Sequence, residues 1–316
     1  LVPGQGRGRA CYAVGKDTLG MEADSLRCGF IALLGRPNVG KSTLMNRILE
    51  EKVSITSSRP QTTRNRILGI HTYRDSQAVY MDTPGIHDWK GELNQWMVEQ
   101  SRRAAADSDV AVMMIEADRP WRDPDLSVLE LVEKLEVPRI LVINKVDKVD
   151  KPSVLPLIRN SDSLGVFHDI VPLSALKGDN VDRFQEVVRD HLPEGPALFP
   201  EDMITDQAER FWVAEVVREK VVRNTREELP FSTAAVVTGF SEDPEIIRVQ
   251  AEILVEKKSQ KGIIIGSRGR MIKKIGSQAR QDLEKFFGKQ VFVELYVRVS
   301  EKWWKDRDTA SQLGMR

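Results

Sequence analysis

The sequence has few cysteines, no long hydrophobic run and no net charge, and each absence narrows what the protein can be. Its 316 residues include only Cys11 and Cys28, which lack metal-ligand spacing and suit a reducing compartment. No apolar segment approaches the ~18 residues that span a bilayer, so we predict no transmembrane helix. Because 47 basic residues balance 47 acidic ones, any nucleic-acid site must be a local patch.

The N-terminal residues also lack features that would give them a role. Residues 1–25 are rich in glycine, show no hydrophobic periodicity and contain no apolar segment of the secretory type. We therefore expect a disordered N-terminal extension over 1–25. The rest of the chain is long enough for two domains with separate cores. We place the first domain at 26–192, a Pro-rich linker at 193–205 and the second domain at 206–316.

The segment GRPNVGKSTLMN, which begins at Gly35, predicts a phosphate-binding loop. Gly35, Gly40, Lys41 and Ser42 match the pattern G-x-x-x-x-G-K-S/T, with an apolar run before it and a helix-forming stretch after it. The glycines let backbone N–H groups point at phosphate oxygens, Lys41 supplies a charge, and Ser42 supplies a hydroxyl for Mg²⁺. The alternative is a glycine turn without a ligand, but every required residue is present in the required context.

Short apolar runs alternate with helical stretches between Phe30 and His191. The runs are FIALLG, QAVYMD, DVAVMMIEA, PRILVINKVD and DIVPLSA. This alternation is typical of parallel strands covered by helices on both faces. We therefore predict an α/β domain with a mostly parallel sheet, whose ligand loops lie at the carboxyl ends of the strands.

Three further motifs lie at those strand ends and indicate the base. DTPG, Asp82–Gly85, offers a carboxylate for a Mg²⁺-bound water and a glycine N–H for a γ-phosphate. NKVD, Asn144–Asp147, offers the Asp147 carboxylate to the N1–H and N2–H₂ of guanine, a donor pair that adenine lacks. Ser174–Ala175 can offer a backbone N–H to the guanine O6. Together the motifs predict guanine rather than adenine.

These four motifs, in this order, resemble those of the translation-factor-related GTPases. In the segment SSRPQTTRNRILGI we choose Thr63 as the hydroxyl that closes on Mg²⁺, with Thr62 as the second candidate and a solvated loop as the alternative. Ile86 stands where many GTPases carry a water-orienting glutamine, which predicts slow intrinsic hydrolysis or help from elsewhere. In related GTPases without that glutamine, an asparagine at the position of Asn38 helps to bind K⁺, so the resemblance implies stimulation by K⁺.

The second half of the chain predicts an RNA-binding domain. A long amphipathic helix (DQAERFWVAEVVREKVVRNTREE) precedes two strand-like runs, two helices around Gly266–Gly269 and a final strand (VFVELYVRV). This order, α-β-β-α-α-β, resembles a type II KH domain, in which glycines at both ends of the loop let the backbone approach a sugar–phosphate chain. The apolar GIIIG before the loop can provide a floor for bases.

Charge and aromatic residues in this half of the chain each allow two interpretations. From Lys257 to Lys289 there are ten Lys or Arg residues against two acidic ones, which supplies the local basic patch that RNA requires. The alternatives are a chance G-x-x-G match and a Lys-rich helix that is only solvated. Trp303–Trp304 could stack on bases, but we expect the pair to pack a terminal helix onto the sheet.

A GTPase domain followed by a type II KH domain resembles the Era family over nearly all of Cys28 to Met315, including SITSSRPQTTR, DTPGIH and FPEDMITD. The resemblance implies a GTPase that binds 16S ribosomal RNA near its 3′ end and assists its processing and 30S subunit biogenesis. It also implies Mg²⁺ as a cofactor and a cytoplasmic protein with a peripheral membrane-associated pool. We expect a monomer that does not bind DNA.

The residues that we predict to act fall into four sets. The catalytic residues are Lys41, Thr63, Gly85 and Asn38. GTP or GDP binding is assigned to Gly35, Arg36, Pro37, Asn38, Val39, Gly40, Lys41, Ser42, Asp82, Thr83, Pro84, Gly85, Ile86, Asn144, Lys145, Val146, Asp147, Ser174 and Ala175. The Mg²⁺ ligands are Ser42, Thr63 and Asp82. The RNA-binding residues are Gly266, Ser267, Arg268, Gly269, Lys273 and Lys274.

Other functions compete with this interpretation. A metabolic kinase or ATPase would share the phosphate loop but should lack the guanine-binding Asn144–Asp147. A constitutive RNA-binding protein with a vestigial nucleotide fold would not need to keep Lys41, Ser42 and Asp82 together. A P-loop NTPase with a general RNA-binding or RNA-chaperone role, not tied to the ribosome, is the remaining alternative.

Overall fold

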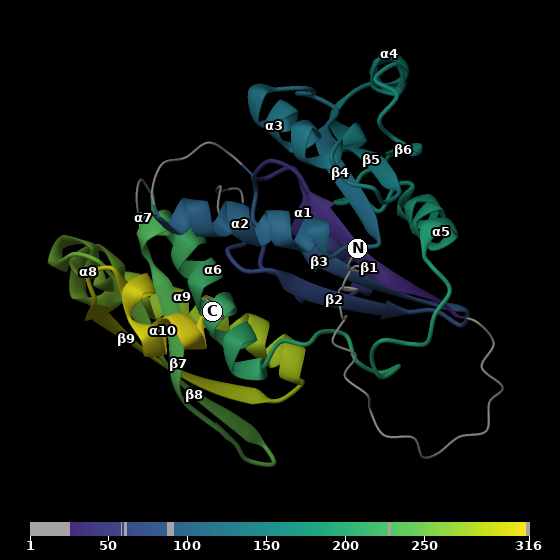
Figure 1. Ribbon diagram of the computed structural model, residues 1–316. Coiled ribbons are helices and arrows are strands. Elements are labelled where there is room, and N and C mark those ends of the chain that lie inside the picture. The colour runs from purple at the N-terminus through teal and green to yellow at the C-terminus, as the bar shows by residue number, and fades with distance from the viewer. Residues whose placement is uncertain (1–25, 58, 60–61, 87–91, 227–228, 314–316) are drawn as a thin grey trace, which may run out of the picture.

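The computed structural model describes residues 26–57, 59, 62–86, 92–226 and 229–313, and the predicted N-terminal extension over 1–25 lies outside them. The described residues form two sheets, each covered by helices (Figure 1). A six-stranded sheet has the order β2-β3-β1-β4-β5-β6, and a three-stranded sheet has the order β7-β8-β9. Among the described residues, no helix is both long and apolar enough to cross a bilayer.

The six-stranded sheet confirms the prediction of an α/β domain with a mostly parallel sheet. Its parallel strands are β1 (Arg27–Leu34), β3 (Ser76–Asp82), β4 (Val110–Glu116), β5 (Arg139–Asn144) and β6 (Asp169–Pro172). The sequence analysis did not identify β2 (Ile67–Thr72), which pairs antiparallel with β3 from Ile67↔Asp82 to Thr72↔Gln77. A tight turn at Tyr73–Asp75 connects the two strands. The sequence analysis missed β2 because it directly follows a segment rich in loop-forming residues.

Helices cover both faces of this sheet, because neighbouring residues of a strand point to opposite sides. On one face, Ile31 and Leu33 pack with side chains of α1 (Lys41–Leu49) and α5 (Val181–His191). On the other face, Ala32 and Leu34 pack with side chains of three helices. These are α2 (Glu92–Ala106), α3 (Asp123–Val132) and α4 (Lys151–Asp162). The chain thus continues from each parallel strand toward a helix, and these connections carry the predicted ligand motifs.

The segment predicted as a linker is hydrogen-bonded along the six-stranded sheet. The carbonyl of Pro193 accepts from the backbone N–H of Cys28 at 2.9 Å. Farther along, the side chain of Gln77 bonds both the N–H and the C=O of Phe199, and the carbonyl of Ile204 accepts from Ile70 at 2.8 Å. The segment is therefore held in place by the first domain, while its boundaries, 193–205, stay a prediction.

The three-stranded sheet confirms the type II KH order. Its elements are α6 (Glu209–Asn224), α7 (Leu229–Ser232), β7 (Ala234–Glu242), β8 (Ile246–Val255), α8 (Lys258–Ile265), α9 (Arg270–Phe287) and β9 (Gln290–Val299). Strand β8 pairs antiparallel with β7 and parallel with β9. One face of the sheet packs against α6 and α9, through residues such as Val217, Ile275 and Leu283.

The C-terminal residues cover one end of the other face of this sheet. A 3₁₀ turn, η3 (Trp303–Lys305), leads into α10 (Arg307–Gln312). Trp303 is 1% exposed, packs on Ala234, Val236 and Leu254, and donates its indole N–H to the carbonyl of Ser232 at 3.0 Å. The expected packing role of Trp303 is therefore confirmed.

Helix α6 forms where it was predicted, but its polar side is buried instead of exposed to solvent. Every residue from Trp212 to Val222 is buried. The helix lies between the two halves of the molecule (Figure 1), so its polar side faces the first domain instead of water. Charged residues such as Arg218 and Glu219 are consequently inside the protein.

Candidate nucleotide site and RNA-binding loop

The phosphate loop joins the end of β1 to the start of α1, and its glycines allow close approach of other segments. Gly40 has φ 112°, and a Cβ there would collide with the side-chain amide of Asn144. A Cβ on Gly85 would lie 2.5 Å from the backbone nitrogen of Pro37. The DTPG and NKVD motifs therefore both pack directly on the phosphate loop, and only glycine permits this contact.

Lys41 points its ammonium group at the backbone of the same loop. Its Nζ donates to the carbonyls of Gly35 at 3.0 Å and Arg36 at 3.2 Å, and the residue is 6% exposed. Burial lowers the pKa of Lys41 to about 8, against the opposing effect of the Asp82 carboxylate. A phosphate oxygen near this ammonium would favour its charged form.

The three predicted Mg²⁺ ligands lie together. The hydroxyl of Ser42 donates to Oδ2 of Asp82 at 2.6 Å and lies 2.9 Å from Oγ1 of Thr63, which is 3.2 Å from the same carboxylate oxygen. Burial raises the pKa of Asp82, although Lys41 and these hydroxyls oppose the shift. Ser54, the first residue of SITSSRPQTTR, also donates to Asp82 at 2.6 Å, but the sequence analysis did not assign it to the site.

Two observations bear on whether these residues fit Mg²⁺. Oδ1 of Asp82 is buried and has no hydrogen-bond partner among the described residues, so it is available to a cation. Hydroxyl and carboxylate oxygens are also the ligands that Mg²⁺ prefers. Thr62, the second candidate, lies elsewhere, because its hydroxyl contacts Ser57 at 2.7 Å and the carbonyl of Arg59 at 2.8 Å. The donor set therefore fits Mg²⁺ with Thr63 rather than Thr62.

The guanine motif is built around the side chain of Asn144. Its Nδ2 donates to the carbonyl of Val39 at 2.8 Å, and its Oδ1 accepts from the N–H groups of Lys145 at 2.7 Å and Ala175 at 3.0 Å. Asp147 accepts from the hydroxyl of Ser174 at 2.5 Å. The structure therefore brings the predicted residues together. The N–H of Ala175 would have to share or exchange its bond with Asn144 to reach a guanine O6.

Several of the predicted nucleotide residues support the loops by packing or hydrogen-bonding in the protein interior. Val39 lies in the apolar core, and the hydroxyl of Thr83 donates to the carbonyl of Leu33 at 2.6 Å. The side chain of Ile86 packs in the core on the other face of the sheet, so it does not reach the phosphate side. Pro84 accepts from Ser101 at 2.8 Å, and Val146 begins the short turn η1 (Val146–Lys148).

The cavity at the phosphate loop is small. It is bounded by residues that include Lys41, Ser42, Thr63 and Gly85, and its volume is about 70 Å³. Ligand sites of nucleotide size usually measure several hundred Å³. The described residues therefore leave little enclosed space at the phosphate loop itself.

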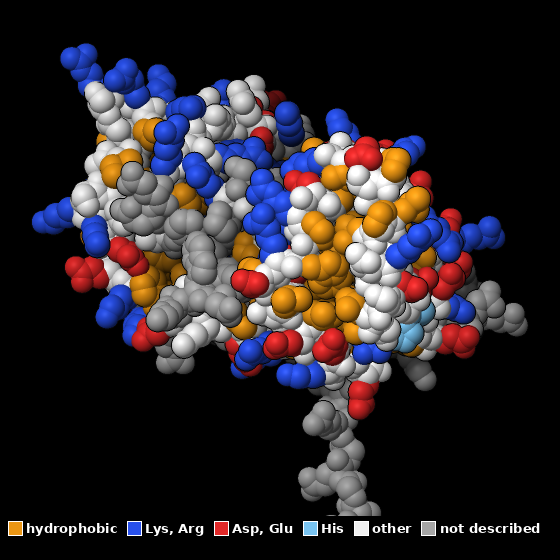
Figure 2. All heavy atoms as spheres, turned by 90° about the horizontal axis from the view of Figure 1, so that it is seen from above, with side chains coloured by type: hydrophobic (Ala, Val, Ile, Leu, Met, Phe, Trp, Pro, Cys, Tyr) orange, Lys and Arg blue, Asp and Glu red, His pale blue; other side chains and the backbone are white. Residues whose placement is uncertain are grey.

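The predicted RNA-binding loop, Gly266–Gly269, connects α8 to α9. Gly266, Arg268 and Gly269 have φ values of 71°, 51° and 74°, so three of the four loop positions have positive φ, and Arg268 and Gly269 are left-handed. Arg268, Lys273 and Lys274 are exposed, and none has an ion-pair partner among the described residues. Figure 2 shows Lys and Arg side chains at the end of the molecule where Figure 1 places α8, on the left in both views.

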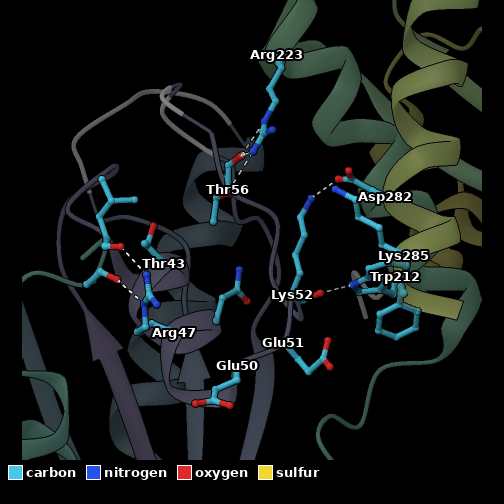
Figure 3. A pocket seen from close by; sticks show the side chains of 14 residues that line it. Thr43, Arg47, Glu50, Glu51, Lys52, Thr56, Trp212, Arg223, Asp282 and Lys285 are labelled. Atoms are coloured by element: carbon cyan, nitrogen blue, oxygen red, sulfur yellow. Dashed lines mark hydrogen bonds and ion pairs between the residues drawn. The ribbon is translucent and has the colours of Figure 1, made fainter. Parts of the chain in front are cut away.

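A larger groove, of about 730 Å³, lies between the two domains (Figure 3). Lys52, in the loop after α1, donates to Asp282 of α9 at 2.6 Å, and its carbonyl accepts from the indole of Trp212 at 2.7 Å. Arg223 of α6 donates to the carbonyl of Thr56 at 2.9 Å. Sequence reasoning missed these contacts, because an amphipathic pattern does not show that the polar side of α6 packs against the first domain.

Comparisons with known proteins agree with this geometry. Residues 30–145 match the family model of the 50S ribosome-binding GTPases, and residues 228–304 match that of the KH domain. GTPase Era of Geotalea daltonii is 48% identical over 93% of this chain and 99% of its own length. GTPase Era of Coxiella burnetii is 45% identical over 91% of this chain and 97% of its own length.

Two solved structures resemble the whole described fold. The structure of Era in complex with MgGDPNP and nucleotides 1506–1542 of 16S ribosomal RNA has a TM-score of 0.88 and 40% identity. It covers 92% of this chain and 99% of its own. An Aquifex aeolicus Era variant bound to GDP and AlF₄⁻ has the same TM-score, identity and coverage.

Proposed function

The chain belongs to the GTPase Era family, and from this premise we propose that it binds the 3′ end of 16S ribosomal RNA through its KH domain and assists small-subunit biogenesis. Its GTPase activity follows from the family itself. The observation that carries the RNA proposal is the likeness, along 92% of the chain, to an Era structure that holds this RNA segment. The exposed cations beside Gly266–Gly269 are the groups that would contact its phosphates.

The nucleotide site that we propose comprises the phosphate loop, DTPG, NKVD and Ser174–Ala175. In hydrolysis a water oxygen bonds to the γ-phosphorus while the bond from this phosphorus to the β–γ bridging oxygen breaks and leaves GDP. The loop N–H groups and the ammonium of Lys41 stabilise the charge that develops on the leaving oxygen. Ser42, Thr63 and Asp82 would hold Mg²⁺, which supplies further positive charge at the β- and γ-phosphates.

Two finer proposals rest on the family resemblance. Asn38 is exposed, with φ 65°, at the turn of the phosphate loop, and we propose that its side chain helps to bind a K⁺ that assists hydrolysis. We also propose that the protein is a cytoplasmic monomer with a peripheral membrane-associated pool. We propose domain boundaries at 26–192 and 206–316. Ile86 supports a need for such help, because its buried side chain cannot orient water.

The RNA proposal is tested by reversing charge in the loop. Ser267→Asp combined with Arg268→Asp places negative charge where a phosphodiester would lie, and aspartate tolerates the left-handed conformation of Arg268. Affinity for an oligonucleotide of the 16S 3′ end should fall by roughly 10-fold or more. The matched control is Thr238→Asp with Arg248→Asp, an equal charge change at exposed positions of β7 and β8.

The outcomes separate this proposal from a general RNA-binding role. In the loop variant GDP should bind as in wild type, because the nucleotide site lies in the other domain. If the control weakens RNA binding as much as the loop variant, the contact is only electrostatic and the loop assignment is wrong. If a scrambled oligonucleotide binds the wild type as tightly as the 16S sequence, the general RNA-binding alternative holds.

A further inference from the structure

Glu116 is the last residue of β4, and β4 lies between the two strands that lead into the nucleotide motifs. In the sheet order, its neighbours are β1, which precedes the phosphate loop, and β5, which ends at Asn144. Glu116 is paired in register with Asn144. Because parallel strands end at the same edge of a sheet, a long side chain here can reach the loops that follow both neighbours.

The Glu116 carboxylate contacts one cation from each motif. Its Oε2 accepts from Nη2 of Arg36 in the phosphate loop at 2.5 Å, and its Oε1 accepts from Nζ of Lys145 in the NKVD motif. Only 7% of the Glu116 side chain and 12% of the Arg36 side chain are exposed, so solvent screens their interaction poorly. Lys145 also donates to the carbonyl of Asn38 at 2.8 Å.

A second carboxylate provides a contrast. Asp125 of α3 lies 3.2 Å from Nε of Arg36, and its own side chain is buried. Among the contacts of the described residues, Asp125 reaches the phosphate loop and its own helix start but no residue of Asn144–Asp147. Glu116 therefore differs from Asp125 in joining the two nucleotide motifs.

We propose that Glu116 is a positioning residue that sets the separation between the phosphate loop and the guanine-binding motif. It acts through Arg36 and Lys145 and rests on the nucleotide site proposed above. A guanine nucleotide contacts both motifs at once, so an error in their separation weakens its binding at one end or the other. A ligand that uses only the phosphate loop does not depend on this separation.

The test compares a ligand that uses both motifs with one that uses only the phosphate loop. Glu116→Gln keeps the size of the side chain and removes its charge. The Kd of GDP should rise about 10-fold, whereas the Ki of inorganic pyrophosphate as a competitor should change less than about 2-fold. The matched control, Glu130→Gln, changes an exposed residue of α3 and should leave both values as in wild type. A purely structural role would lower the Tm without changing the ratio of the two affinities.

Further variants keep the outcomes distinct. Lys41→Ala should weaken GDP and pyrophosphate alike, and if it weakens neither, the proposed nucleotide site fails rather than the role of Glu116. Arg36→Gln and Glu116→Gln should be non-additive in their effects on GDP, because both break the same bridge. In Glu116→Asp the shorter side chain cannot reach both cations, so GDP binding should also weaken. This variant replaces Glu116→Gln in the test if Glu116→Gln does not fold. A wild-type Kd in the folded variant, or additive effects, would overturn the proposal.

Discussion

The backbone N–H of Thr56 donates to Oε1 of Glu219 at 3.0 Å, although the two residues are 163 positions apart in the chain. Glu219 has a fully buried side chain on α6 and is also ion-paired with Lys52 at 2.7 Å, Lys220 at 2.7 Å and Arg223 at 3.0 Å. Burial alone would raise the pKa of Glu219, but Lys52 and Lys220 bring it below its ordinary value. One ionised carboxylate thus holds the loop after α1 against the KH domain.

Glu219→Gln should destabilise the protein strongly. The neutral amide removes the buried counter-charge that Lys52, Lys220 and Arg223 share, although Lys52 and Lys220 keep Asp282 as a second acidic partner. Losing one partner of a buried ion pair costs roughly 3 kcal/mol. The free energy of unfolding in urea measures this loss. Glu209→Gln, an exposed change in the first turn of the same helix, should stay within about 0.5 kcal/mol of wild type. Equal unfolding midpoints for the two variants would contradict the role of Glu219.

Asp147→Asn should move base preference from guanine toward xanthine. The change turns one acceptor into a donor, which suits the oxygen at C2 of xanthine instead of the amino group of guanine. Competition between GDP and xanthosine diphosphate, measured by displacement of a fluorescent nucleotide, gives the preference. Asp150→Asn, three residues farther along, is the control and should keep the wild-type preference. An unchanged preference in Asp147→Asn would remove Asp147 from the base site.

GTP hydrolysis should be faster in KCl than in NaCl at equal ionic strength. A K⁺ ion held in part by Asn38 would stabilise the negative charge that develops on the β–γ bridging oxygen, and Ile86 offers no polar group to assist. We expect the hydrolysis rate to rise about 10-fold, which corresponds to ~1.4 kcal/mol of barrier. Asn38→Gly should erase most of the difference, and glycine adopts φ 65° without strain. Steady-state phosphate release measures both rates. Equal rates of the wild type in the two salts would show that K⁺ has no role.

GDP binding should take up protons near pH 8. Burial lowers the pKa of Lys41 to about 8, so at this pH about half of its amines are neutral before a phosphate binds. Phosphate favours the ammonium and raises its pKa, which predicts an uptake of about half a proton at pH 8 and almost none from this group at pH 6.5. Calorimetry in two buffers with different ionisation enthalpies measures the uptake.

Lys145 provides the control for this experiment. Burial also lowers the pKa of Lys145 to about 8. In Lys145→Gln the contribution of Lys41 alone should remain, so uptake that vanishes in this variant would assign the titrating group to Lys145. No uptake in the wild type would mean that Lys41 is already charged before the nucleotide binds.

Local sequence was sufficient to predict the strand–loop–helix units and the motifs at their ends. Gly35, Gly40, Lys41 and Ser42 have their roles set within eight positions of the chain, because a turn, a charge and a hydroxyl must follow one another there. The order of elements in the KH domain was also predictable from local sequence, because the hydrophobic periodicity of each segment indicates a helix or a strand. Strand β2 was missed because its apolar run is short and follows a segment typical of loops.

Contacts between distant segments were decided only by the tertiary structure. Ser54 on Asp82, Glu116 between Arg36 and Lys145, and Glu219 on Thr56 each join residues from separate elements. A buried charge needs a partner, so the Arg and Glu residues of α6 must be paired once the fold buries them. Which residue supplies the partner depends on how sheets and helices pack. The free energy of that packing comes from burial of apolar surface, which is non-directional and does not specify which residues meet. Sequence therefore determined the chemistry of each loop, and the fold determined which loops act on one another.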